Sequence, residues 1–392
     1  MPNIKRGMMG AAGAVSAAGS LWGWGRNASG ALGLGDTTNR SSPVQVGDLT
    51  DWTDVAASGY NAAGFAIKSD GSLWSWGDNT YGELGNGNTT DSSSPVQVGS
   101  LTNWFQVEAG QSHVIAIKTD GTLWAWGRNN YGQLGLGSTT DYSSPVQVGS
   151  LADWKGNTSA DLTAGTPIKV QAGKDISIVI KDDGTIWVWG YGGRGALGDG
   201  DEYSRSSPVQ LGSLTDWLSV QGPSRNDPTT FAVKTGGTLW AWGNNEQGQL
   251  GQGTSGVASA SSPVQIGALT TWNGNLATPG DSGMAVKTDG TLWAWGQGSS
   301  GQLGLGSTTS YSSPVQVGSL TDWGVITSGY NYMRVIKTDG TLWTWGLNSP
   351  YGTLGNGTTT NSSSPVQVGS LTSWGKIMRG NASSCTIALQ FN

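Results

Sequence analysis

Two short segments of the sequence contain residue types that could bind a ligand. Gly190–Gly195 reads GYGGRG and has the spacing of a dinucleotide-binding loop, in which glycines and a following helix N-terminus hold a pyrophosphate. No helical pattern follows, so we interpret it as a glycine-rich turn. Asp199, Asp201 and Glu202 place three acids within four residues, and Ca²⁺ prefers such oxygen ligands. The longer spacing of a calcium loop is missing, which favours a solvated turn.

The chain has one histidine, His113, and one cysteine, Cys385, so it has no site that needs two imidazoles and no internal disulfide. His113 begins an apolar run typical of a strand, and no titratable partner is visible beside it. We expect a partly buried structural histidine. Cys385 lies beside Thr386 and Ile387 and is expected in the core. The sequence thus predicts no catalytic residue, no metal site and no cofactor.

The composition limits the fold and the partners. The 392 residues include 65 Gly, 13 Pro and 21 Trp, with 12% charged residues and a net charge of -6. This is too aromatic for a disordered chain and too rich in glycine for long helices. An acidic chain does not attract phosphate backbones, so nucleic acid is not an expected partner. No stretch approaches the twenty apolar residues of a membrane span.

A repeat of about fifty residues organises the whole chain. The pattern Trp-x-Trp-Gly occurs seven times, beginning at Trp22, Trp74, Trp124, Trp187, Trp240, Trp293 and Trp343. Each copy is followed by Ser-Pro-Val-Gln and then by a third tryptophan, at Trp52, Trp104, Trp154, Trp217, Trp272, Trp323 and Trp374. These positions account for all 21 tryptophans. We interpret the paired tryptophans as core residues, which leaves none for a ligand site.

Each repeat contains four candidate strands. In the run that begins at Trp104, Phe105–Ala109 and Val146–Val148 flank two alternating runs joined by a turn at Thr119–Gly121. In Thr122–Trp126 both faces are apolar, which is typical of a strand covered on both sides. The sequence therefore predicts an all-β protein, a seven-bladed β-propeller of four-stranded antiparallel blades.

The two ends of the chain each contain an incomplete repeat. The segment after Trp374 supplies two strands, whereas Gly19–Gly25 supplies a third strand without two good predecessors. We predict that residues 374–390 pair with residues 20–46, which closes a single propeller over residues 18–392 and removes both free edges.

Two segments fall outside the repeat. Residues 1–17 are interpreted as an N-terminal extension, which can be a degenerate strand, a secretory signal or an arm that docks onto a larger assembly. The 63-residue spacing between Trp124 and Trp187 indicates an insertion at about residues 155–166, which is either a spacer without a partner or a loop of the kind through which ring proteins bind partners. The candidate partner-binding residues are Ile4, Lys5, Arg6, Met8, Met9, Lys155, Asn157, Asp161, Asp199 and Asp201.

The repeat resembles that of the regulator of chromosome condensation family. The resemblance rests on Asp-Gly-Thr-Leu-Trp-Ala-Trp-Gly, Asn-x-Tyr-Gly-Gln-Leu-Gly and Ser-Pro-Val, and it covers about residues 18–390. It departs locally at Gly190–Gly198 and at Gly236, where a hairpin aspartate is missing. The resemblance implies a seven-bladed propeller. The founding eukaryotic member is an exchange factor for the GTPase Ran, whereas similar bacterial and viral propellers are surface proteins or secreted inhibitors.

The regular repeats and neutral loops favour the bacterial and viral surface kind. We therefore expect a non-enzymatic structural or protein-binding module on a virion, such as a phage, or on a cell surface, docked to a protein assembly through its N-terminal segment. A secreted inhibitor that uses one propeller face is the first alternative, and a nucleotide exchange factor for a small GTPase is the second. The expected location is the virion or the extracellular surface, with the cytoplasm as the alternative.

Overall fold

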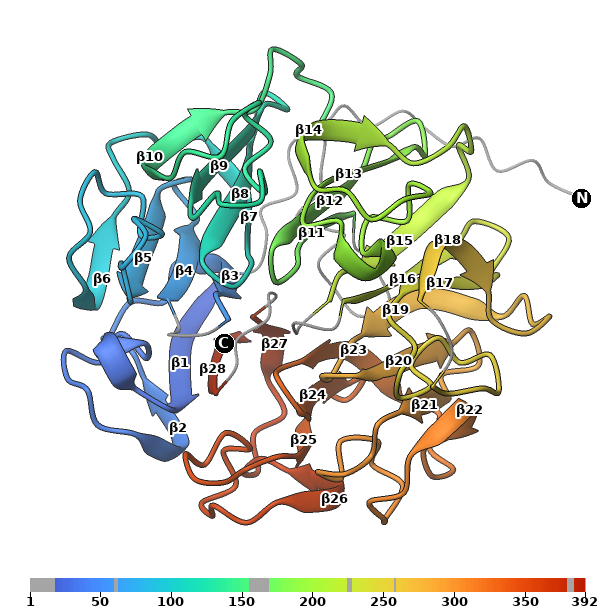
Figure 1. The fold of residues 1–392 in the computed structure, drawn as a ribbon. Helices are drawn as coiled ribbons and strands as arrows, with labels where there is room; N and C mark the ends of the chain where they lie inside the picture. The colour runs from blue at the N-terminus through green and yellow to red at the C-terminus, as the bar shows by residue number, and fades with distance from the viewer. Residues whose placement is uncertain are drawn as a thin grey trace, which may run out of the picture.

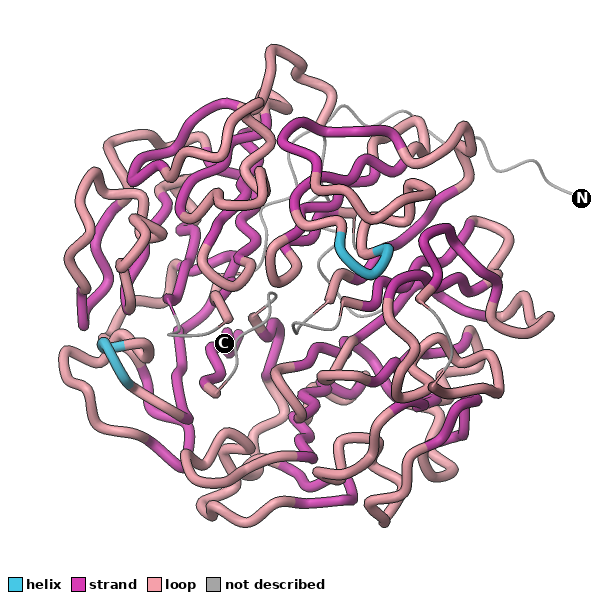
Figure 2. Tube along the Cα trace, in the orientation of Figure 1, coloured by secondary structure: helices cyan, strands magenta, loops and turns pink. Residues whose placement is uncertain are grey.

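The computed structural model describes residues 18–59, 63–154, 169–223, 228–256, 259–378 and 384–391. In these residues the chain forms antiparallel strands and two single-turn 3-10 segments, η1 (Ala28–Gly30) and η3 (Gly193–Gly195) (Figure 2). None of the described segments is a helix with the length and hydropathy needed to cross a bilayer.

The strands form seven four-stranded blades around a central axis, as Figure 1 shows. Blade 1 contains β27 (Trp374–Ile377), β28 (Cys385–Phe391), β1 (Gly19–Gly25) and β2 (Arg40–Gln45). Blade 2 contains β3 (Trp52–Ala57), β4 (Ala63–Lys68), β5 (Leu73–Gly77) and β6 (Ser92–Gln97). Blade 3 contains β7 (Trp104–Ala109), β8 (His113–Lys118), β9 (Leu123–Gly127) and β10 (Tyr142–Gln147). Blade 4 contains β11 (Val170–Ala172), β12 (Ile176–Ile180), β13 (Ile186–Gly190) and β14 (Arg205–Gln210).

The remaining three blades follow the same order, with the first strand innermost and the fourth at the rim (Figure 1). Blade 5 contains β15 (Trp217–Gln221), β16 (Thr229–Lys234), β17 (Leu239–Gly243) and β18 (Ala260–Gln265). Blade 6 contains β19 (Trp272–Ala277), β20 (Ser282–Lys287), β21 (Leu292–Gly296) and β22 (Tyr311–Gln316). Blade 7 contains β23 (Trp323–Ser328), β24 (Tyr332–Lys337), β25 (Leu342–Gly346) and β26 (Ser362–Gln367). The predicted fold class is confirmed.

The two ends of the chain close the ring within blade 1. β28 pairs with β1 along its whole length, from Gly19 opposite Phe391 to Gly25 opposite Cys385. β27 pairs with the other edge of β28, and β2 pairs with β1. The predicted pairing of residues 374–390 with residues 20–46 is therefore confirmed. The expected N-terminal extension and the insertion at residues 155–166 lie outside the described residues.

The second tryptophan of each Trp-x-Trp-Gly motif links two blades. Its side chain is fully buried, and its indole N–H donates to a backbone carbonyl of the preceding blade, as in Trp126 to Glu83 at 2.7 Å. The same bond occurs in every blade, from Trp24, Trp76, Trp126, Trp189, Trp242, Trp295 and Trp345. Each blade thus satisfies a buried polar group of its neighbour, which fixes the spacing of the blades.

Within each of blades 2 to 7, a lysine stacks on the other two tryptophans of the same blade. In blade 3 the Lys118 ammonium lies 3.5 Å from the centre of the Trp124 ring and 4.8 Å from that of Trp104. Blades 2 to 7 all contain this arrangement, with Lys68, Lys118, Lys181, Lys234, Lys287 and Lys337. The repeat pattern did not reveal it, because Lys and Trp are adjacent only across the sheet.

The residue before the third tryptophan of a repeat decides whether the lysine stacked on that tryptophan has an acidic partner. Four of the lysines form ion pairs there, with Asp51, Asp153, Asp216 and Asp322. In blades 3 and 6 the position is Asn103 or Thr271, and burial lowers the pKa of Lys118 and Lys287. These two ammonium groups also lie closest to a ring, at 3.5 and 3.7 Å. The indole face therefore takes over part of the role of the missing carboxylate.

The propeller has two faces that differ in their connections. On one face, the loop face, lie the connections between the first and second and between the third and fourth strands of each blade. On the other, the hairpin face, lie the tight turns between the second and third strands and the segments that enter the next blade. The prolines of the Ser-Pro-Val-Gln motifs lie on the outermost strands, where they interrupt an exposed edge that could pair with another chain.

Candidate functional site

In five blades the loop after the third strand is held by a buried asparagine, at Asn27, Asn79, Asn129, Asn245 or Asn348, and glycine takes this position in blades 4 and 6. In blade 3 the Asn129 amide donates to the carbonyls of Ser138 and Thr140, and its oxygen accepts from the Leu134 N–H. Gly132, at a φ of +79°, lies against Ser206 of the next blade, where a side chain would collide. The loop is thus preorganised, with Tyr131 exposed at its tip.

Tyrosine and arginine side chains meet across neighbouring blades on this face. The Tyr131 and Tyr191 rings lie edge to face, with centroids 4.9 Å apart. The Arg128 guanidinium lies 4.9 Å from the centre of the Tyr81 ring. Arg26 has the same relation to Tyr351, at 5.3 Å. Tyrosine and arginine are the side chains that most often dominate protein interfaces.

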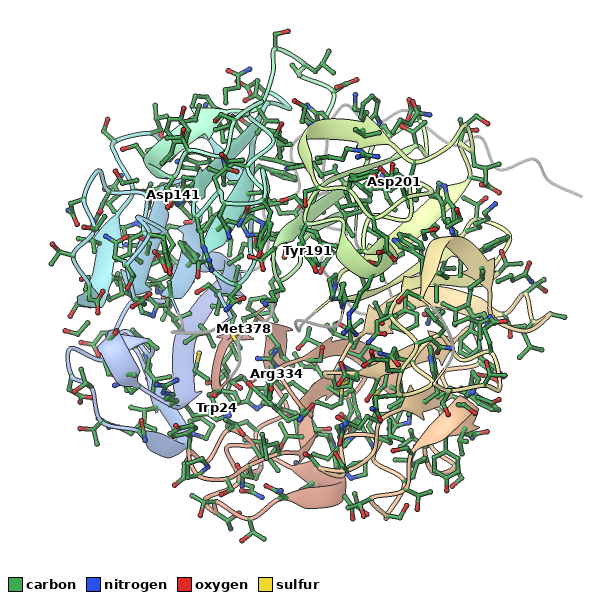
Figure 3. All side chains as sticks on the ribbon, in the orientation of Figure 1. Trp24, Asp141, Tyr191, Asp201, Arg334 and Met378 are labelled. Atoms are coloured by element: carbon green, nitrogen blue, oxygen red, sulfur yellow. The ribbon has the colours of Figure 1, made fainter. Side chains whose placement is uncertain are left out.

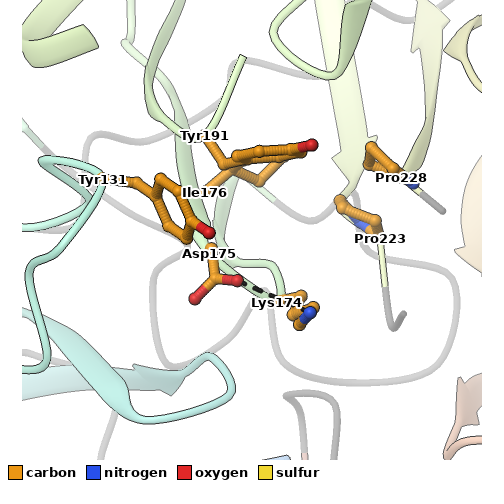
Figure 4. Close-up of a pocket in the computed structure, with 7 residues that line it drawn as sticks. All are labelled: Tyr131, Lys174, Asp175, Ile176, Tyr191, Pro223 and Pro228. Atoms are coloured by element: carbon orange, nitrogen blue, oxygen red, sulfur yellow. Dashed lines mark ion pairs between the residues drawn. The ribbon is translucent and has the colours of Figure 1, made fainter. Parts of the chain in front are cut away.

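A pocket of about 200 Å³ opens beside the tyrosine pair, as the close-up in Figure 4 shows. Its wall joins three blades, because Tyr131 comes from blade 3 and Tyr191 from blade 4, whereas Pro223 and Pro228 belong to blade 5. The remaining lining residues are Lys174, Asp175 and Ile176. The volume suits one side chain of a partner, and the pocket exists only when the ring is assembled.

Asp175 is the ionisable group at the base of the pocket. Burial raises its pKa, although Lys174 and Arg128 oppose the shift by favouring the carboxylate. Its carboxylate lies 3.7 Å from the Lys174 ammonium and accepts a 3.4 Å hydrogen bond from Gln133. Asp175 therefore has partners of its own. The geometry suits recognition of a side chain and does not resemble a paired acid and base.

One pair of side chains resembles a catalytic pair by type. His113 Nε2 lies 3.0 Å from Ser177 Oγ, but both side chains are completely buried. The Ser177 hydroxyl donates to the Gln133 carbonyl, so the imidazole Nε2 acts as the donor to the hydroxyl oxygen. Burial lowers the pKa of His113 to about 3, which keeps it neutral. The sequence analysis expected partial burial, and the burial is in fact complete because the ring packs between blades 3 and 4.

Of the candidate partner-binding residues, the structure describes Asp199 and Asp201. Asp199 and Asp201 both form ion pairs with Arg205, at 2.7 Å in each case. Asp201 also accepts from the Tyr203 N–H, and it lies toward the outer part of the ring (Figure 3). The expected solvated turn is corrected for Asp199, whose side chain is 5% exposed because Arg205 covers it. The other candidates, Ile4, Lys5, Arg6, Met8, Met9, Lys155, Asn157 and Asp161, lie outside the described residues.

The glycine-rich segment, the possible metal ligands and the cysteine form no ligand site among the described residues. The GYGGRG segment ends β13 and forms the single turn η3, without a helix N-terminus to hold a phosphate. Among the described residues, no group of three or more His, Cys, Asp and Glu side chains could hold a metal ion. Cys385 is fully buried, as predicted, and burial raises the pKa of its thiol to about 12.

Sequence reasoning missed the pocket itself. Tyr191 falls in the segment Gly190–Gly198, where repeat four departs from the family pattern in a loop. A signal was available in Pro223 and Pro228, because these prolines do not belong to a Ser-Pro-Val motif. The site is thus formed by residues that depart from the repeat pattern, and such departures were the available signal.

Comparison with known proteins places these features in a family context. The profile of the regulator of chromosome condensation (RCC1) repeat matches seven times, at residues 18–63, 70–117, 120–180, 183–222, 236–272, 289–333 and 339–387. The chain is similar to the ultraviolet-B receptor UVR8 of Arabidopsis thaliana, with 30% identity over 75% of this chain and 64% of the receptor. It is also similar to the human E3 ubiquitin-protein ligase HERC2, with 28% identity over 78% of this chain and 6% of the ligase. The chain thus spans less than two thirds of both relatives.

Solved structures show the same fold at low sequence identity. Human WBSCR16 has a TM-score of 0.80 at 21% identity and covers 95% of this chain and 99% of its own. Prp20p of Saccharomyces cerevisiae has a TM-score of 0.78 at 18% identity and covers 97% of this chain and 93% of its own. These relatives and neighbours are eukaryotic, so they give no support to the expected bacterial or viral surface kind.

Proposed function

The chain belongs to the regulator of chromosome condensation repeat family, and from this premise we propose that it is a non-enzymatic protein-binding module that contacts its partner through the loop face. The observation that carries the proposal is the pocket shared by Tyr131, Tyr191 and the two prolines of blade 5. It is concave, aromatic and preorganised by three blades, which are the properties of an interface centre.

The chemistry of the face supports binding over catalysis. Arg26, Arg128 and Arg194 lie on the loop face, and each holds a tyrosine or an acid of a neighbouring loop. Rigid aromatic and arginine side chains lose little conformational entropy when a partner docks. Related propellers bind proteins: yeast RCC1 (Prp20) has been solved bound to Kap60, and Prp20p is described with Gsp1p and histones.

The location and the finer role stay proposals. We propose a place on a virion or cell surface with the N-terminal segment docked to an assembly, on the basis of the neutral Gly-, Ser- and Thr-rich loops. A secreted inhibitor and an exchange factor are the alternatives. Deletion of residues 1–17 is expected to abolish co-purification with a particle of fixed stoichiometry, and retained tight binding to a soluble enzyme would favour the inhibitor. Accelerated nucleotide release from a Ran-type GTPase would favour the exchange factor.

The loop-face proposal predicts that one partner contacts both tyrosines. A photo-crosslinking amino acid at position 131 or 191 of the full chain should capture the same protein from the native host. The control position is Leu214, which lies on the opposite, hairpin face and is 46% exposed. A crosslinker there should not capture that protein.

Affinity then gives the quantitative test. With the captured partner purified, Tyr131→Ala is expected to weaken binding more than tenfold, as hot-spot substitutions do, and Leu214→Ala less than twofold. Isothermal titration calorimetry with the folded variants measures both. An unchanged dissociation constant for Tyr131→Ala and Tyr191→Ala would contradict the proposed use of this face.

A further inference from the structure

Two apolar grooves run between neighbouring blades, and each extends from the connection after the third strand to the segment on the hairpin face that enters the next blade. The groove between blades 6 and 7 has a volume of about 440 Å³, with Trp323 and Trp343 of blade 7 facing Val317 and Leu320 across it. The equivalent groove between blades 5 and 6 has about 420 Å³ and contains Trp293. Among the described residues, no charged side chain lines either groove. Trp293 and Trp343 are only partly buried, so part of each ring is accessible there.

Each groove lies beside an exposed leucine that recurs once per repeat. The seven leucines are 39–49% exposed, at Leu49, Leu101, Leu151, Leu214, Leu269, Leu320 and Leu371. They belong to the hairpin face, because the segment that carries each of six of them packs on the hairpin of the preceding blade. In blade 7, for example, the Trp374 N–H donates to Gly340, and Gly340 lies against Thr372, next to Leu371. The hairpin face therefore carries one exposed leucine per repeat.

The same hairpins present negative charge. Five of them contain an exposed aspartate whose carboxylate accepts from the N–H and hydroxyl of the Ser or Thr two residues later. These are Asp70, Asp120, Asp183, Asp289 and Asp339. None of the five forms an ion pair with a described residue, whereas the lysines of this face are folded beneath tryptophans. The lysine two residues before each aspartate helps to lower the pKa of its carboxyl group, after the hydrogen bonds from the Ser or Thr, but it forms no close ion pair with it. The surface therefore combines apolar grooves with exposed carboxylates that form no close ion pair with a described residue.

We propose that the hairpin face docks a basic segment of a partner protein, with apolar side chains in the Trp–Leu grooves and Lys or Arg side chains at the hairpin aspartates. Charge complementarity argues for this occupant, because the carboxylates repel nucleic acid and anionic lipid headgroups. The repeated spacing lets several grooves act on one partner, which strengthens weak individual contacts. The proposal concerns the face opposite the tyrosine pocket and goes beyond the loop-face function.

The first test uses three synthetic probes of equal length. One peptide alternates Leu and Lys, the second alternates Leu and Glu, and the third alternates Gly and Lys. Titration of the full chain at low ionic strength, followed by tryptophan fluorescence, should show the tightest binding for the Leu/Lys peptide and no binding of the Leu/Glu peptide. The Gly/Lys peptide should bind at least tenfold more weakly, because it leaves the grooves empty. Equal binding of the Leu/Glu or the Gly/Lys peptide would overturn the proposal, as would tighter binding to anionic phospholipid vesicles.

The second test asks whether the hairpin aspartates bind the peptide directly or whether any loss of negative charge from the protein weakens binding equally. Asp289→Asn with Asp339→Asn is expected to weaken Leu/Lys binding about fivefold at low ionic strength and to have little effect in concentrated salt. The matched control is Asp91→Asn with Asp141→Asn on the loop face. Asn39 and Asn361 already make the equivalent hydrogen bond there, so folding should be kept. Equal weakening by both pairs would overturn the proposal.

The grooves themselves are tested by Leu269→Ser with Leu320→Ser, which should lower affinity for the Leu/Lys peptide and leave Gly/Lys binding unchanged. Both leucines are nearly half exposed, so the fold does not depend on them. Unchanged Leu/Lys affinity would contradict a role for the grooves. Tyr131→Ala should not alter any of these titrations, which keeps a failure here distinguishable from a failure of the loop-face function.

Discussion

A chain that ends at Ser384 is expected to lose its cooperative fold. Removal of Cys385–Phe391 takes away β28, the strand between β27 and β1 that pairs with all seven residues of β1. Ile387, Ala388 and Leu389 are completely buried, so blade 1 would lose its core together with its hydrogen bonds. The loss is expected to match the whole folding free energy, about 5–15 kcal/mol for a typical domain.

The effect should come from the open ring and not from the missing residues alone. Gly19 lies directly opposite Phe391, so a short turn can join β28 to β1 as a hairpin. A circular permutant with this turn and new ends beside Gly212, a hairpin-face position with free space around it, keeps every strand. Urea titration followed by circular dichroism should show one transition near that of the parent for the permutant and none for the truncation. A truncated chain that unfolds at the parent midpoint would refute closure as the source of stability.

The fold could be predicted from the sequence because the repeat encodes it. The spacing of Trp-x-Trp-Gly counts the blades, and the incomplete repeats around Gly19–Gly25 and after Trp374 require that the ends meet. A period of two also placed Trp124 and Trp126 on the same face of β9. Each of these inferences needs only the pattern within one strand or the number of strands in the chain.

Contacts between side chains of different strands or different blades could not be predicted in the same way. The Lys118 ammonium meets Trp104 and Trp124 across three strands of blade 3, and the pocket joins Tyr131 to Tyr191 and Pro223 over three blades. The first contact depends on the strand register within a blade and the second on the packing of neighbouring blades, and the spacing of the repeat gives neither. Asp199 was expected in solvent for the same reason, since Arg205 reaches it only when the loop is folded.

Glu83 occupies a loop position at which three other blades have glutamine. In blades 3, 5 and 6 the equivalent residue is Gln133, Gln249 or Gln302, whose carbonyl oxygen accepts a loop N–H at 2.8–2.9 Å. Glu83 makes the same bond, accepting from the Tyr81 N–H at 2.7 Å, with its side chain 1% exposed. Burial raises the pKa of Glu83 to about 8, with a smaller contribution from the neighbouring Asp78. The carboxyl group is therefore protonated at neutral pH and imitates the glutamine.

Glu83→Gln is consequently expected to stabilise the protein increasingly as the pH rises. Between the ordinary value of 4.5 and about 8, the folded chain keeps a proton that the unfolded chain has lost, so the stability of the parent falls with pH. At about 1.4 kcal/mol per pH unit, the variant should gain about 3–4 kcal/mol over the parent between pH 4.5 and 7.5. Urea unfolding at several pH values measures this difference. Gln302→Glu is the matched control and should introduce the same loss into blade 6, whereas parallel pH profiles for parent and Glu83→Gln would show that Glu83 ionises freely in the folded ring.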